Sequence, residues 1–142
     1  MELAVFVVED NAEIRENLEQ ALEELTCVKV VGDAATEEDA LQWITGQNHW
    51  DMLILDLFLK GGNGLRVVQH VQRARPEQKV IVFSNYVNAA VRKRCAQLGV
   101  DAVFDKSTEI DALVDYCSHQ CTLMGAQSAP APLSPTGGSR SS

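Results

Sequence analysis

The sequence predicts an α/β fold with a parallel sheet, because short apolar runs alternate with longer amphipathic segments through most of its 142 residues. The apolar runs contain few polar residues, which is typical of strands that are covered on both faces. A hydrophobic content of 46% is enough for the core of one domain. Right-handed crossovers then leave few topologies for such a sheet.

Five strands and five helices are expected in alternation. The strands, rich in Val, Ile, Leu and Phe, are predicted at residues 3–8, 28–32, 52–55, 80–83 and 102–104. The helices are predicted at residues 12–25, 36–45, 65–73, 88–98 and 110–123. Apolar residues recur at helical spacing in the first helix. Thr36 is suited to cap the second helix, and Gly99 is suited to end the fourth.

The end of the chain has a different composition. From Gly125 the sequence reads "GAQSAPAPLSPTGGSRSS", which lacks the apolar side chains of a core and is expected to be disordered. We therefore predict one domain at residues 1–124 and a tail rich in Ala, Pro, Ser and Gly at residues 125–142. The last residues of this segment fit either a remnant of an expression vector or a truncated linker.

The charge balance argues against direct binding to nucleic acid. The net charge is −8, and the basic groups, 12 in all, are outnumbered by 20 acidic ones. Such a surface repels the phosphate backbone. The apolar runs are also too short to cross a bilayer, so no membrane segment is expected.

The four cysteines, Cys27, Cys95, Cys117 and Cys121, are scattered through the predicted core elements. A chain with this much core needs no disulfide framework, and no signal peptide precedes the first strand. We expect a soluble, reduced, cytoplasmic protein. In "CSHQC" a helix places His119 opposite Cys117 and Cys121, so two structural cysteines are favoured over a metal site.

Polar side chains stand at the carboxyl ends of four predicted strands. Glu9 and Asp10 follow the first strand, Asp56 the third, Ser84 the fourth and Lys106 the fifth. In an open parallel sheet, sites form beyond the carboxyl ends of the strands, so these five side chains are expected to converge.

The chemistry of this set points to a cation and a phosphoryl group. Clustered carboxylates repel one another unless a cation neutralises them, and Mg²⁺ prefers oxygen ligands. Lys106 supplies a positive charge and Ser84 a hydroxyl donor for an anionic group. Asp56 is the candidate nucleophile, since a carboxylate can accept a phosphoryl group as an aspartyl phosphate.

Residues 1–124 resemble the receiver domain of two-component response regulators. The resemblance rests on "VVEDN", "ILDLFLKGGNGL", "VIVFSN" and "FDKS", which occur in this order at strand ends. It implies a flavodoxin-like five-stranded parallel sheet in the order 2-1-3-4-5 with five helices. It also implies a stand-alone receiver domain or part of a larger regulator.

The resemblance assigns a role to each site residue. Asp10 and Asp56 would ligate Mg²⁺ directly, together with the backbone carbonyl of Phe58, while Glu9 would act through water. Asp56 would take its phosphoryl group from the phosphohistidine of a histidine kinase or phosphotransfer protein. Lys106 would contact the phosphate.

The resemblance also implies that Ser84 swings towards the phosphate. Three positions depart from the family pattern. Val103 stands where an aromatic switch residue is usual, and the neighbouring Phe104 faces the other side of the strand. Lys60 and Ser107 each replace a common proline. Signalling is therefore expected to rely on the Ser84 loop and the helix that follows it.

Two bulky residues are expected to modulate the site. Phe58 and Tyr86 lie two residues beyond Asp56 and Ser84, and we expect them to restrict attacking water and slow dephosphorylation. The "KGGNG" segment lacks the recognised nucleotide-binding patterns and is interpreted as a flexible turn.

The fourth predicted helix carries Arg92, Lys93 and Arg94. They form either an ordinary solvated face or a docking surface for an acidic partner, on the output face formed by the fourth helix, fifth strand and fifth helix. Asp111 and Asp115 on the fifth helix also permit a homodimer through this face.

The leading hypothesis is a phosphorylation-dependent switch that passes its state on by protein–protein contact and is not a turnover enzyme. A degenerate receiver that binds partners without phosphate is the alternative. A hydrolase acting through an aspartyl phosphate would need a second acid just after Asp56, where Leu57 and Phe58 stand.

Overall fold

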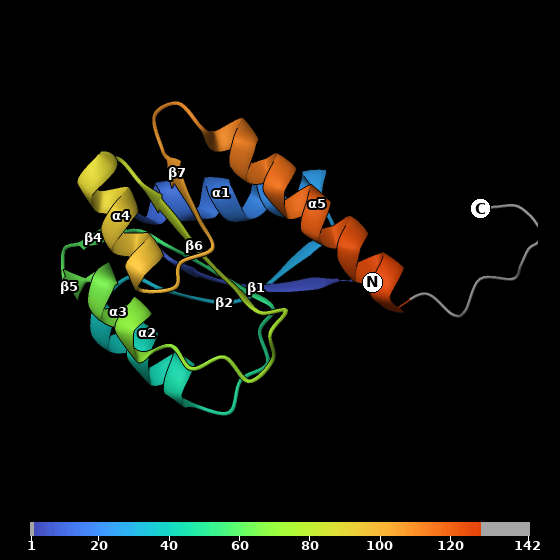
Figure 1. Cartoon of the computed structure of the whole chain (residues 1–142), viewed down its shortest axis with the longest axis horizontal. Helices are drawn as coiled ribbons and strands as arrows, with labels where there is room; N and C mark the ends of the chain where they lie inside the picture. The colour runs from blue at the N-terminus through green and yellow to red at the C-terminus, as the bar shows by residue number, and fades with distance from the viewer. Residues whose placement is uncertain (1, 129–142) are drawn as a thin grey trace, which may run out of the picture.

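Five parallel strands form the central sheet in the computed structural model, which describes residues 2–128 (Figure 1). Their order in space is β2-β1-β3-β6-β7, which confirms the predicted order 2-1-3-4-5 because β6 and β7 are the fourth and fifth strands of this sheet. The strands are β1 (Leu3–Val8), β2 (Val28–Ala34), β3 (Met52–Leu55), β6 (Lys79–Ser84) and β7 (Ala102–Asp105).

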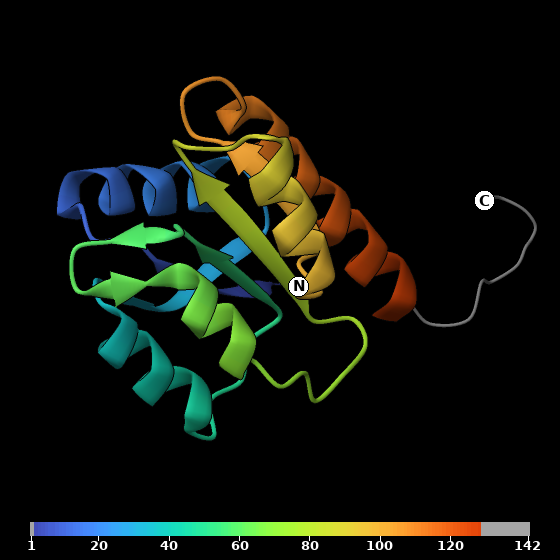
Figure 2. The same cartoon turned by 60° about the vertical axis from the view of Figure 1, so that its left-hand side comes forward.

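Helices cover both faces of the sheet (Figures 1 and 2). Helices α1 (Ala12–Leu25) and α5 (Ile110–Ser128) lie on one face. The other face carries α2 (Glu37–Thr45), α3 (Gly64–His70) and α4 (Ala89–Gln97). The fold is therefore the predicted α/β architecture with five helices.

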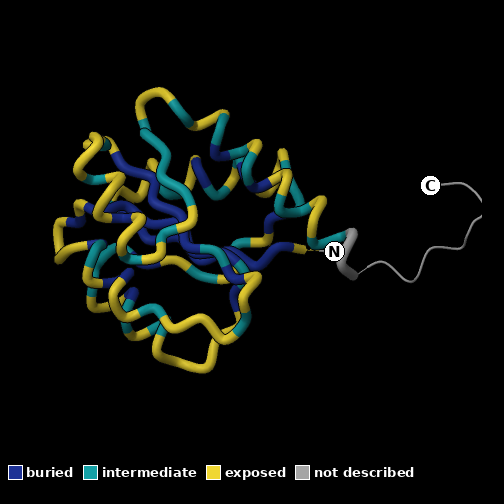
Figure 3. Tube along the Cα trace, in the orientation of Figure 1, coloured by how far each residue is buried: buried dark blue, intermediate teal, exposed yellow. Residues whose placement is uncertain are grey.

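The core consists of two layers separated by the sheet, because successive side chains on a strand point to opposite faces. Val5 and Val7 pack with Leu22 of α1 and Leu113 of α5. Phe6 and Val8 belong to the cluster that faces α2, α3 and α4. All six residues of β1 are buried, so the sheet centre is dark blue in Figure 3.

Side-chain caps fix the beginnings of four helices. The Thr36 hydroxyl accepts the Asp39 amide at 3.1 Å, which confirms the predicted cap of α2. Asparagine side chains do the same for α1, α3 and α4, at Asn11, Asn63 and Asn88. Each cap satisfies a backbone donor that has no partner within the helix.

Several boundaries differ from the prediction. Helix α3 ends at His70, and the Gln78 side chain then accepts the Ala74 and Arg75 amides in the following loop. Helix α5 continues to Ser128, four residues into the predicted tail. The rest of that tail, residues 129–142, lies outside the described residues.

A short antiparallel pair, β4 (Phe58–Leu59) and β5 (Gly62–Asn63), was not predicted. It replaces the flexible turn expected from "KGGNG". The Glu37 amide donates to the Gly61 carbonyl at 3.0 Å, and the Glu37 carboxylate accepts the Asn63 amide at 2.9 Å. The hairpin is thereby fixed to the start of α2.

The prediction of four reduced cysteines is wrong for one pair. Cys27, just after α1, forms a disulfide with Cys121 of α5, with Cα atoms 5.9 Å apart. The partners are 94 residues apart, so the sequence gives no sign of their proximity. Cys95 and Cys117 are buried free thiols, and burial raises the pKa of Cys117 to about 12.

None of the helices in residues 2–128 is both long enough and apolar enough to span a membrane.

Candidate functional site

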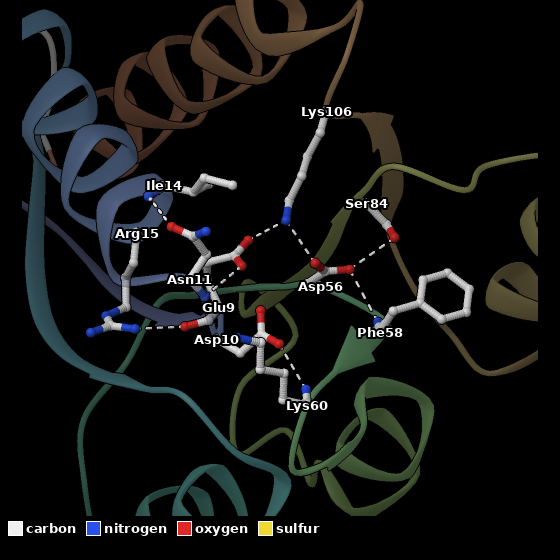
Figure 4. A network of polar contacts seen from close by, with 10 residues as sticks. All are labelled: Glu9, Asp10, Asn11, Ile14, Arg15, Asp56, Phe58, Lys60, Ser84 and Lys106. Atoms are coloured by element: carbon white, nitrogen blue, oxygen red, sulfur yellow. Dashed lines mark hydrogen bonds and ion pairs between the residues drawn. The ribbon is translucent and has the colours of Figure 1, made fainter.

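The five predicted site residues meet at the carboxyl edge of the sheet (Figure 4). Glu9 and Asp10 follow β1, Asp56 follows β3, Ser84 ends β6 and Lys106 follows β7. Parallel pairing aligns these strand ends, since Val8 is in register with Leu55 and Leu55 with Val82. The predicted convergence is therefore present in the structure.

Lys106 joins two carboxylates from different strands. Its Nζ atom lies 2.6 Å from Asp56 Oδ2 and also forms an ion pair with Glu9. All three side chains are at most 8% exposed. Burial acts to lower the Lys106 pKa, but the bonds to Asp56 and Glu9 outweigh it and leave that pKa raised. For the carboxyl group of Glu9, burial has the opposite effect. It raises the pKa of Glu9, and it outweighs the bond to Lys106, which acts to lower that pKa.

Three donors fix the Asp56 carboxylate. Oδ1 accepts the Ser84 hydroxyl at 2.9 Å and the Phe58 amide at 3.1 Å, while Oδ2 faces Lys106. Ser84 is fully buried, and its hydroxyl already points at Asp56. Asp56 is therefore held in one orientation beside a cation and a hydroxyl donor.

The acidic cluster has the composition of a divalent cation site. Oxygen atoms of Glu9, Asp10 and Asp56 lie within 4.8 Å of one another. The single ammonium of Lys106 cannot formally neutralise three carboxylates. Hard oxygen donors with excess negative charge fit Mg²⁺ better than a softer metal.

Asp10 has a fixed orientation as well. Its Oδ2 atom accepts the backbone amide of Lys60 at 2.7 Å (Figure 4). Reasoning from the sequence identified Lys60 only as a departure from the family pattern and missed this contact. A proline at this position would have no amide hydrogen to donate.

Aromatic rings stand at the edge of the site. Phe58 and Tyr86 are 52% and 70% exposed, and their rings make an edge-to-face contact with centroids 5.4 Å apart. Both line a cavity of about 210 Å³ that also contains Glu9, Asp10 and Asp56. The two rings thus lie at the rim of the cavity that holds the carboxylates.

Val103 and Phe104 point to opposite faces of β7, as predicted. Val103 packs with the cluster on the α4 side, whereas Phe104 contacts the Tyr116 ring of α5 at a centroid distance of 5.8 Å. No aromatic side chain from this part of β7 therefore lies between the sheet and α4.

Comparisons with known proteins agree with this architecture. The family model described as "Response regulator receiver domain" matches residues 5–118. The response regulator UvrY of Escherichia coli K12 is 26% identical over 102 residues, which cover 72% of this chain and 46% of UvrY. The chain spans about half the length of the curated relatives it matches.

Two solved structures show the same fold. A two-component response regulator of the LuxR family from Aurantimonas sp. SI85-9A1 matches with a TM-score of 0.74 and 21% identity, covering 88% of this chain and 87% of that one. The non-phosphorylated receiver domain of RcsB from Escherichia coli has a TM-score of 0.68 and 22% identity, covering 89% and 94%.

Proposed function

Because the chain belongs to the response regulator receiver domain family, we propose that it is a phosphorylation-dependent signalling switch whose phosphoacceptor is Asp56. The surroundings of the Asp56 carboxylate support this proposal most directly. It is nearly buried, held by Ser84 and the Phe58 amide, and paired with Lys106 beside two further carboxylates.

The proposed donor is the phosphohistidine of a histidine kinase or phosphotransfer protein. A carboxylate oxygen of Asp56 forms a bond to phosphorus while the phosphorus–nitrogen bond of the donor breaks. The bonding electron pair leaves with the imidazole nitrogen, and the product is an acyl phosphate on Asp56. Lys106 then pairs with the phosphoryl oxygens, and Ser84 donates its hydroxyl to one of them.

Mg²⁺ is the proposed cofactor. When bound, it would neutralise charge on the phosphoryl oxygens and the surrounding carboxylates. Asp10 and Asp56 would be direct ligands with the Phe58 carbonyl, and Glu9 would act through water. The mutual proximity of the three carboxylates supports this assignment.

Phe58, Tyr86 and Val103 are proposed to modulate the switch. The two exposed rings would limit the approach of water to the acyl phosphate. Val103 has a small side chain that cannot act as an aromatic switch. The conformational response to phosphorylation would therefore take place in the loop after Ser84 and in α4.

The proposed output is a protein–protein contact through α4, β7 and α5, with a downstream protein or a second copy of the chain. The exposed Lys93 and Arg94 would suit an acidic partner. The proposed location is the cytoplasm, where the Cys27–Cys121 pair would meet reducing conditions.

Intact-mass spectrometry after incubation with acetyl phosphate tests the function. We expect a Mg²⁺-dependent gain of one phosphoryl group in the wild type and in Asp115→Asn, an exposed control on α5, but not in Asp56→Asn. An adduct that persists in Asp56→Asn would contradict the assignment. Absence of both the adduct and Mg²⁺ binding would instead favour a phosphate-independent interaction module.

A further inference from the structure

Arg92 of α4 reaches across to the next strand and helix. Its Nη1 atom donates to the Val103 carbonyl of β7 at 3.0 Å, and its Nη2 atom lies 3.1 Å from Glu109 Oε1. The planar guanidinium thus binds two acceptors at once, which a lysine cannot do in the same geometry. Arg92 is exposed, as a solvated face requires, but its charged group also has acceptors within the molecule.

Glu109 connects Arg92 to the loop that carries Lys106. The same Oε1 atom accepts the Asp105 amide at 2.9 Å. The Asp105 carboxylate in turn accepts the Ser107 amide at 2.8 Å. The backbone on both sides of Lys106 is therefore held by a network that begins at Arg92.

A second connection runs from Asp56 to α4 through the chain itself. Ser84 bonds Asp56, and only residues 85–88 separate it from the first residue of α4. The Lys106 amide also donates to the Ser84 carbonyl at 3.0 Å. Together with Arg92, these contacts close a ring that passes through Asp56, Ser84, α4, the β7–α5 loop and Lys106.

We propose that Arg92 is a positioning residue that makes α4 and the β7–α5 loop move as one unit when the environment of Asp56 changes. Ser84 and Lys106 both contact Asp56, so a new group on Asp56 displaces the two segments that Arg92 joins. The inference rests on the proposed function of Asp56. A half-exposed ion pair adds little stability, so Arg92→Gln should leave the fold intact while it removes the connection.

Helix α4 offers a matched control. Arg94 lies two residues further on, is exposed, and its guanidinium has no hydrogen bond or ion pair within the described part of the chain. Arg94→Gln removes the same charge as Arg92→Gln without touching the ring.

Hydrogen–deuterium exchange of α4 with and without Mg²⁺ and beryllofluoride, a phosphoryl analogue, tests the inference. We expect the analogue to change α4 exchange in the wild type and in Arg94→Gln. In Arg92→Gln the exchange of the Lys106 loop should still respond, whereas the response of α4 should fall about threefold, because only the connection through Ser84 remains.

The outcomes separate the two proposals. An α4 response in Arg92→Gln equal to that of the wild type would overturn the inference and leave the proposed function intact. If the wild type shows no response anywhere to the analogue, the proposed function fails, and the coupling that depends on it is overturned as well.

Discussion

A Cβ atom on Gly64 would lie only 2.1 Å from the backbone carbonyl oxygen of Asp56. The Gly64 amide also donates to the Leu57 carbonyl at 2.9 Å, so the start of α3 is fixed directly against the proposed phosphoacceptor. No side chain fits at this contact, because both sides of it are backbone.

Gly64→Ala should therefore displace Asp56. We expect a loss of stability of about 2 kcal/mol or more and a marked drop in phosphorylation by acetyl phosphate. Urea unfolding and intact-mass spectrometry give the two readouts. Gly125→Ala is the control, since a Cβ atom there has no neighbour within 4 Å. Equal behaviour of the two variants would contradict the prediction.

Lys60→Pro should weaken Mg²⁺ binding, because it removes the amide that holds Asp10. Lys60→Ala keeps that amide and removes only the charged side chain. We expect Lys60→Ala to bind Mg²⁺ at least as tightly as the wild type and Lys60→Pro to bind about fivefold more weakly. Isothermal titration calorimetry measures both, and indistinguishable affinities would show that the amide plays no part.

Replacing both Phe58 and Tyr86 with serine should shorten the lifetime of the phosphorylated form by about threefold or more, as water gains access to Asp56. Because the two rings contact each other, each single variant should show much of the effect. The decay is followed by intact-mass spectrometry after removal of the phosphodonor. An unchanged lifetime in the double variant would refute this role.

Cys27→Ser should lower the free energy of unfolding by about 4 kcal/mol in oxidising buffer, because the Cys27–Cys121 link closes a long loop in the unfolded chain. Urea unfolding with and without dithiothreitol is the measurement. In the presence of reductant the wild type and the variant should agree closely. A large difference that persists after reduction would assign the loss to packing instead.

Stability should fall as the pH rises from about 4.5 to 8, owing to Glu19. Burial, and then the neighbouring Asp33 carboxylate, raise the pKa of Glu19 to about 8. The folded state thus binds a proton that the unfolded state has already lost in this range. With allowance for solvent screening, the free energy of unfolding should fall by an amount on the order of 1 kcal/mol over this pH range.

Glu19→Gln should remove this part of the pH dependence, as measured by urea unfolding at several pH values. Glu16→Gln, which removes an exposed carboxylate from the same helix, is the matched control. A pH profile of Glu19→Gln that follows the wild type would show that another group is responsible.

The architecture, and the set of residues that meet at the site, were predictable because both depend on simple rules. Apolar runs define the strands, and parallel strands bring their carboxyl ends to one edge. It follows that Asp10, Asp56 and Lys106 meet, whatever their detailed contacts. The predicted convergence required only the strand ends, not the conformations of the side chains.

The remaining features depend on contacts that spacing does not encode. The Lys60 amide reaches Asp10 only because a hairpin forms where the glycines indicated a flexible turn. The Cys27–Cys121 pairing depends on α5 packing beside α1, a contact that the spacing of the cysteines does not encode. Arg92 looked like part of a solvated face, and its acceptors on other elements became visible only in three dimensions.

Under mechanical load, the disulfide would separate the acidic site into two parts, one inside and one outside the loop that it closes. If the described chain were pulled from its two ends, the Cys27–Cys121 bond would carry the tension and keep the loop between them, on the order of 300 Å of extended chain, from lengthening. Asp56 and Lys106 lie inside this closed loop, whereas Glu9 and Asp10 lie outside it. Tension would therefore pull Glu9 and Asp10 away from the site. Asp56 and Lys106 would stay together within the loop that the disulfide closes.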